Sequence, residues 1–97
     1  MEIINFSKII FQPDKDQNVL TENNKFKIRN IEIKAGGQIP ECNMENWVIF
    51  YVREGNGTIV INGKLSNIIE QDLVFTEPAK VSFEAETKMK ILGIIIK

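Results

Sequence analysis

An Asn62-Gly63 pair between two short apolar runs is the feature that most restricts the fold of this chain. Such a pair is typical of a two-residue β-hairpin turn of type I′, in which both central residues have positive φ. We therefore expect one strand from about Thr58 to Ile61 before the turn and another within 64–70 after it.

A central hairpin is predicted to lead into this turn. Residues 35–46 contain a Gly-Gly turn and a loop that Pro40 stiffens, and a strand follows from about Trp47 to Arg53. A Gly-rich turn then leads into the strand that ends at Ile61. Alternation places Val48, Phe50 and Val52 on one face of the first strand and Trp47, Ile49 and Tyr51 on the other. Both faces are apolar, so we expect self-association to cover the second one.

The other segments also indicate short strands separated by turns. We expect strand pieces within Glu2–Phe11, a turn at Pro13–Asp16, and a long strand over Phe26–Ile33 with a bulge or bend at Arg29-Asn30. Further strands are expected over 72–76, from Val81, and over 89–96, with a turn at 77–80. No 3.6-residue periodicity long enough for a helix is present. About eight to ten short strands predict an all-β sandwich or barrel.

Composition narrows the class of protein. The chain has 97 residues, which suits one domain, and 12 basic against 13 acidic residues give a net charge of -1. No one-sided basic stripe favours nucleic acid or an anionic membrane. We expect no signal peptide, because the N-terminus lacks a basic region followed by a long apolar run. We expect no membrane-spanning helix, because no apolar run reaches roughly 20 residues. The lone Cys42 cannot form an internal disulfide, which favours a reducing cytoplasm.

The chain contains no histidine. Histidine is the commonest metal ligand and the commonest general base near neutral pH. Its absence therefore disfavours imidazole-based metal sites, a His base, and a cysteine-histidine pair that would activate Cys42.

The spacing of the central stretch resembles the first motif of the cupin family. That motif runs glycine, five residues, His-x-His, three or four residues, Glu, six residues, glycine. Here the same spacing reads Gly36, five residues, Cys42-x-Met44, three residues, Val48, six residues, Gly55.

A second stretch, residues 71–83, is similar to the second cupin motif, a Gly-Asp pair leading to Pro-x-Gly-x-x-His. Asp72 and Pro78 are kept, and Phe83 stands at the histidine position. The resemblance spans about residues 28–96 and implies a double-stranded β-helix, or jelly-roll barrel. It implies a single domain over 1–97, with an N-terminal strand segment and loop at 1–25 and the barrel core at 26–97.

Cupins commonly hold a divalent metal with three imidazoles and a carboxylate. The matching positions here are Cys42, Met44, Val48 and Phe83, and valine and phenylalanine offer no lone pair. The resemblance therefore implies a metal-free, cofactor-free, non-catalytic homodimer, because small single-domain cupins generally pair. Its barrel is expected to be packed shut or to form an apolar pocket for a small ligand, lined by Cys42, Met44, Val48, Phe50 and Phe83.

Two other hypotheses stay open. Cys42 and Met44 offer soft sulfur ligands, which with Glu41 or Glu45 would make an atypical metal site in an enzyme, although alternation favours a solvent-facing position for both glutamates. Alternatively, the chain is a subunit that docks a separate protein through its apolar strands.

Overall fold

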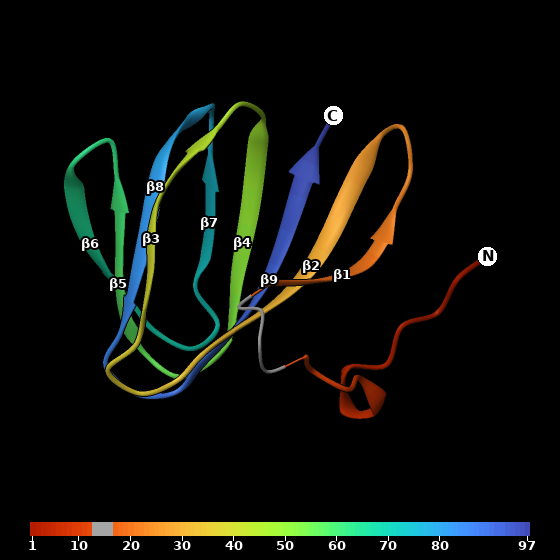
Figure 1. The fold of residues 1–97 in the computed structure, drawn as a ribbon, viewed down its shortest axis with the longest axis horizontal. Helices are drawn as coiled ribbons and strands as arrows, with labels where there is room; N and C mark the ends of the chain where they lie inside the picture. Colours follow the sequence, from red (N-terminus) through yellow and green to blue (C-terminus); the bar gives the residue numbers. More distant parts are fainter. Residues whose placement is uncertain (13–16) are drawn as a thin grey trace.

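The computed structural model describes residues 1–12 and 17–97, and within them nine strands form two antiparallel sheets that face each other (Figure 1). One sheet has the order β1-β2-β9-β4-β7, and the other has the order β3-β8-β5-β6. The strands are β1 (Gln17–Glu22), β2 (Phe26–Ile33), β3 (Gln38–Met44), β4 (Trp47–Glu54), β5 (Gly57–Ile61), β6 (Lys64–Ile68), β7 (Leu73–Thr76), β8 (Ala79–Ala85) and β9 (Met89–Ile96). The predicted all-β jelly-roll architecture is confirmed.

The Asn62-Gly63 turn joins β5 to β6, as predicted. The two residues have φ values of 50° and 81°, and Ile61 pairs with Lys64 across the turn. The side chain of Asn62 also accepts a hydrogen bond from the backbone N–H of Lys80 at 2.9 Å. The turn is therefore tied to β8, the neighbour of β5 on its other side.

The predicted central hairpin between β4 and β5 is wrong, because these strands lie in different sheets. The glycine-rich link between them crosses from one sheet to the other instead of folding back (Figure 1). Gly55 has a φ of +85°, and a Cβ atom there would lie 2.1 Å from the carbonyl oxygen of Lys88. Glycine lets the link pack directly against the loop between β8 and β9.

The segment Gln38–Met44, predicted as a loop, is strand β3. It lies at the edge of its sheet and pairs with β8, with a register shift between Ile39 and Cys42. Pro40 falls within that shift, which explains why a residue without a backbone N–H is accommodated in a strand.

The expected bulge at Arg29-Asn30 is also wrong, since β2 pairs with β9 residue by residue from Phe26 to Ile33. The irregularity lies in the partner strand β1, between Val19 and Thr21.

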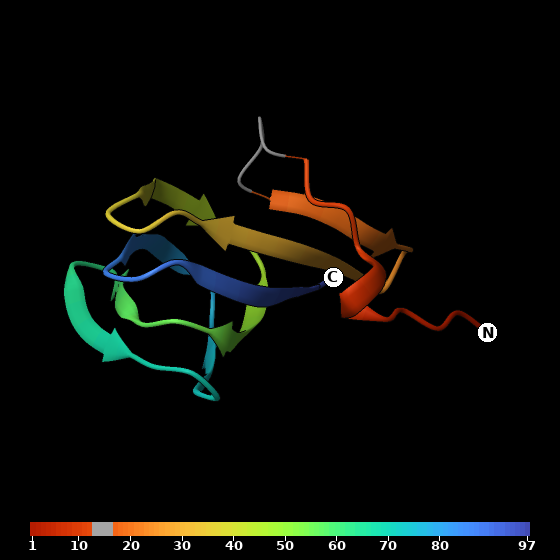
Figure 2. The same cartoon turned by 90° about the horizontal axis from the view of Figure 1, so that it is seen from below.

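The N-terminal segment contains no strand between Glu2 and Phe11, contrary to expectation, but a 3₁₀ turn, η1 (Phe6–Lys8). The side chain of Asn5 caps it by accepting a hydrogen bond from the backbone N–H of Ser7 at 2.9 Å. The segment runs along the side of the five-stranded sheet that faces away from the other sheet (Figure 2). The predicted turn at Pro13–Asp16 lies outside the described residues.

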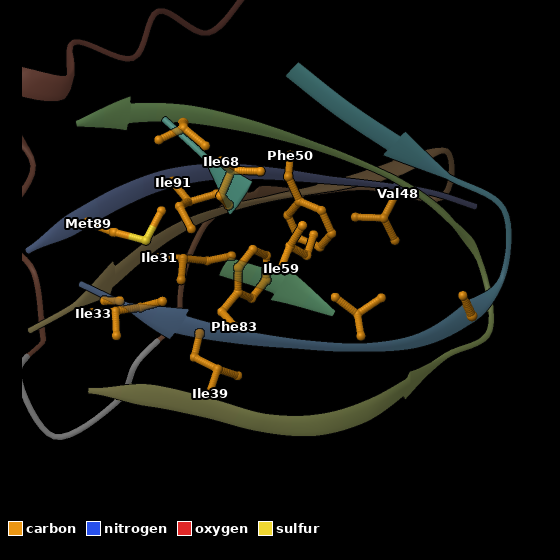
Figure 3. Close-up of a cluster of buried hydrophobic side chains, with 14 of the residues drawn as sticks. Ile31, Ile33, Ile39, Val48, Phe50, Ile59, Ile68, Phe83, Met89 and Ile91 are labelled. Atoms are coloured by element: carbon orange, nitrogen blue, oxygen red, sulfur yellow. The ribbon is translucent and has the colours of Figure 1, made fainter. Parts of the chain in front are cut away.

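The core fills the space between the two sheets (Figure 3). Val48, Phe50 and Val52 point into it, as alternation along β4 predicts, and each is at most 4% exposed. Every second residue of β8 and β9 is likewise buried. Across residues 1–12 and 17–97, no helix is long and apolar enough to cross a membrane.

Candidate functional site: an apolar pocket between the sheets

All five residues predicted to line a barrel pocket lie around one pocket between the sheets. Val48 and Phe50 come from β4 of the five-stranded sheet, Cys42 and Met44 from β3, and Phe83 from β8 of the other sheet. The remaining lining residues are Arg29, Ile31, Ile39, Val81, Gly93 and Ile95.

Two aromatic rings meet across this pocket. The ring centroids of Phe50 and Phe83 are 5.0 Å apart with an interplanar angle of 86°, an edge-to-face contact between the two sheets. Both side chains point into the interior (Figure 3) and are at most 5% exposed. Edge-to-face pairs contribute about 0.5–1.5 kcal/mol beyond the area that they bury, so this contact helps to hold the sheets together.

The pocket is small, and β3 contributes its exposed lining residue, Cys42. Its volume is about 20 Å³, little more than the minimum of about 10–15 Å³ needed to hold one water molecule. Cys42 is exposed and Met44 is half-buried at the rim. Because methionine has a flexible, unbranched side chain, Met44 is the lining residue best suited to move and enlarge the space.

The residues at the cupin metal positions do not fit a metal ion. Val48 and Phe83 carry no donor atom, and the two sulfur-bearing residues Cys42 and Met44 lie on β3, the strand next to the one that carries Phe83. Glu41 and Glu45 are exposed and do not line the pocket. In the part of the chain that the structure describes, no three Cys, Asp or Glu side chains come together to hold an ion. The pocket therefore lacks the nitrogen and oxygen donors with which cupins hold a divalent metal.

Arg29 and Gly93 are the lining residues that sequence reasoning missed. The expected bulge at Arg29-Asn30 left the direction of Arg29 undefined, although strict alternation from Ile31 and Ile33 would have placed it on the inner face. The role of Gly93 depends on which residues flank it on neighbouring strands, and local sequence does not contain that information.

Comparison with known proteins identifies the fold. No protein-family model and no curated protein matches this chain. Among solved structures, an RmlC-like cupin protein from Desulfovibrio desulfuricans is 24% identical with a TM-score of 0.85, over 99% of this chain and 96% of that one. A cupin superfamily protein from Desulfitobacterium hafniense is 14% identical with a TM-score of 0.75, over 82% of this chain and 74% of that one.

This chain has a cupin fold. Salicylate 1,2-dioxygenase from Pseudoaminobacter salicylatoxidans also matches, at 22% identity and a TM-score of 0.71, over 74% of this chain. The match spans only 20% of the dioxygenase chain. At these identities the likeness extends to the cupin fold and not to an activity.

Proposed function

We propose that this protein is a metal-free, homodimeric cupin-fold module that binds a small, mostly apolar molecule in its barrel pocket. The observation that carries the proposal is the lining itself, in which apolar and sulfur-containing side chains occupy the positions of the cupin metal ligands. Binding sites for small molecules are largely apolar clefts with a few polar groups, and this pocket has that make-up.

The pocket proposal is tested by titrating the protein with 3-methylbutanamide, a neutral branched probe, and following ¹³C-methyl NMR signals of methionine and isoleucine. We expect saturable shifts centred on Met44 and Ile95. Gly93→Ala should weaken binding by about tenfold, because the added Cβ atom would lie 3.2 Å from Cδ1 of Ile31 and narrow the pocket. Leu65→Ala, on the exposed face of β6, is the control and should bind as the wild type does.

The outer face of the five-stranded sheet supports the homodimer. Trp47 is 49% exposed, Ile96 44%, Leu73 62% and Phe75 68%. The register places Trp47 beside Ile96 and sets Phe75 and Leu73 against the strand that carries Trp47. These side chains therefore form one apolar patch across β9, β4 and β7, which we call the outer patch.

The size of the outer patch suits a second copy of the chain. Its four residues expose on the order of 400 Å², about half of the roughly 800 Å² that each partner buries in a standard interface. Half-buried Ile49, Tyr51, Leu92 and Ile94 lie between them on the same face and extend the apolar area. Apolar patches of a few hundred Å² often mark interaction sites.

The N-terminal segment covers only the neighbouring part of this face. Phe6 lies 4.0 Å from the guanidinium carbon of Arg53 in a cation–π contact, and Arg53 donates a hydrogen bond to the side-chain oxygen of Asn30 at 3.3 Å. Asn30 is only 1% exposed beneath this cover. The outer patch itself stays exposed and is available to a partner molecule. A reduced, unpaired Cys42 agrees with a cytoplasmic location for such a dimer.

A further inference from the structure

The five residues ahead of η1, which we call the arm, carry apolar side chains that their own copy leaves in water. Ile3 is 82% exposed, and Met1 is also open to solvent. Among the described residues, no hydrogen bond or ion pair joins positions 1–4 to the strands. Met1 and Ile3 therefore gain almost no burial from their own barrel.

The arm leaves the molecule on the face that carries the outer patch. Phe6, directly after the arm, lies against Arg53 of β4, with the guanidinium carbon 4.0 Å from its ring centroid. Ahead of this contact, the chain leads away from the five-stranded sheet on the side opposite the other sheet (Figure 2). A second copy that sits on the outer patch would therefore meet the arm.

The length of the arm is sufficient to cross the outer patch of such a copy. Neighbouring strands of a sheet lie about 4.8 Å apart, so β9, β4 and β7 span about 10 Å. Five extended residues reach about 17 Å. An arm that enters at one side of the patch can therefore reach the other side.

The spacing of the exposed side chains also matches. Leu73 and Phe75 are two residues apart on β7, an edge strand of its sheet, and are 62% and 68% exposed. Met1 and Ile3 are likewise two residues apart, and in an extended segment such residues point to the same side. Two apolar side chains of the arm can thus pack on two of the patch.

The arm supplies apolar area that the outer patch lacks by itself. The four patch residues expose about half of the roughly 800 Å² that each partner buries in a standard interface. The arm of the second copy adds the side chains of Met1 and Ile3 to this contact. In a two-fold dimer every contact occurs twice, so both arms contribute.

We propose that in the homodimer the arm of each copy lies across the outer patch of its partner, with Met1 and Ile3 packed on Leu73 and Phe75. The inference rests on the proposed homodimer and names the segment of the second copy that covers this face. Exchange of identical segments is a low-cost route to a dimer. Here the cost is small because the arm has few contacts with its own barrel.

The first test locates the arm by cross-linking within the full-length protein. Ile3 is replaced by the photoreactive residue p-benzoylphenylalanine, and ¹⁴N-labelled and ¹⁵N-labelled copies are mixed, allowed to exchange subunits and irradiated. We expect mass spectrometry to find cross-links from position 3 to the peptide that contains Leu73 and Phe75. Pairs of one light and one heavy peptide show that the two ends belong to different copies.

The second test measures the dissociation constant of the dimer by sedimentation over a dilution series. Ile3→Asp should raise it by about tenfold or more, because the variant places a charge against an apolar surface. Ile10→Asp is the matched control, since Ile10 is 84% exposed but lies after η1, near the hydrogen bond from the backbone N–H of Gln12 to Asn18. It should leave the dissociation constant unchanged.

The outcomes separate the arm from the dimer itself. A dimer in which position 3 cross-links only within its own copy would overturn the inference and leave the homodimer standing. Equal effects of Ile3→Asp and Ile10→Asp on the dissociation constant would do the same. A wild-type chain that stays monomeric at high concentration would contradict both the inference and the proposed homodimer.

Discussion

At the scale of single residues, Phe83 occupies the cupin position of the last histidine. Its ring is 5% exposed and packs edge-on against Phe50. We predict that Phe83→Asp lowers the free energy of unfolding by about 3 kcal/mol or more, because it buries an unpaired carboxylate in the core. Urea denaturation measures this change.

The matched control for Phe83→Asp is Leu65→Asp, which adds the same carboxylate at a side chain 69% exposed on β6. It should change the free energy of unfolding by no more than about 0.5 kcal/mol. Similar small effects of both substitutions would show that Phe83 does not face the interior.

The residues of the pocket were predictable to different degrees. Motif spacing and strand alternation were enough to indicate Cys42, Met44, Val48, Phe50 and Phe83. Alternation from Ile31 and Ile33 was enough to place Arg29 on the inner face, but Gly93 becomes a lining residue only through the pairing of β2 and β4 with β9, strands far apart in the sequence. Such pairings are set by long-range packing, so local patterns do not reveal them.

At the scale of elements, turn chemistry was a sound guide for the β5–β6 hairpin and misleading for the link between β4 and β5. A glycine-rich link fits either a tight turn or a close backbone crossing, and the difference at Gly55 lies in its contact with Lys88, a residue distant in the sequence. The same limit applies to β3, where Pro40 suggested a loop. The local sequence does not show that this segment is an edge strand with a register shift at the proline.

This contact gives a prediction for Gly55→Ala. Gly55 and Gly63 have similar positive φ values, +85° and +81°, but only at Gly55 would a Cβ atom clash, 2.1 Å from a backbone oxygen. Gly63→Ala should therefore destabilise by about 1–2 kcal/mol from the backbone conformation alone. Gly55→Ala should cost clearly more in chemical denaturation, and equal losses would contradict the close crossing of the link over the β8–β9 loop.

At the scale of the whole molecule, the outer patch predicts the oligomeric state. We expect light scattering to give twice the monomer mass of 11.1 kDa. Phe75→Glu should shift the protein to monomer, because it places a charge in the apolar interface, with little effect on the fold since Phe75 is 68% exposed.

The control for the dimer prediction is Leu65→Glu, on the exposed surface of the other sheet, which should remain a dimer. A wild-type chain that is monomeric at high concentration would contradict self-association. It would instead favour docking of a separate protein on the outer patch.

We propose that the interior of this cupin fold binds its ligand through apolar side chains without a metal ion. The most direct measurement combines elemental analysis of protein purified without an affinity tag with the 3-methylbutanamide titration before and after treatment with a chelator. We predict a content of Mn, Fe, Ni, Cu and Zn well below one ion per chain and the same affinity in both titrations. One ion per chain that disappears in Cys42→Ser, or an affinity lost on chelation, would contradict the account.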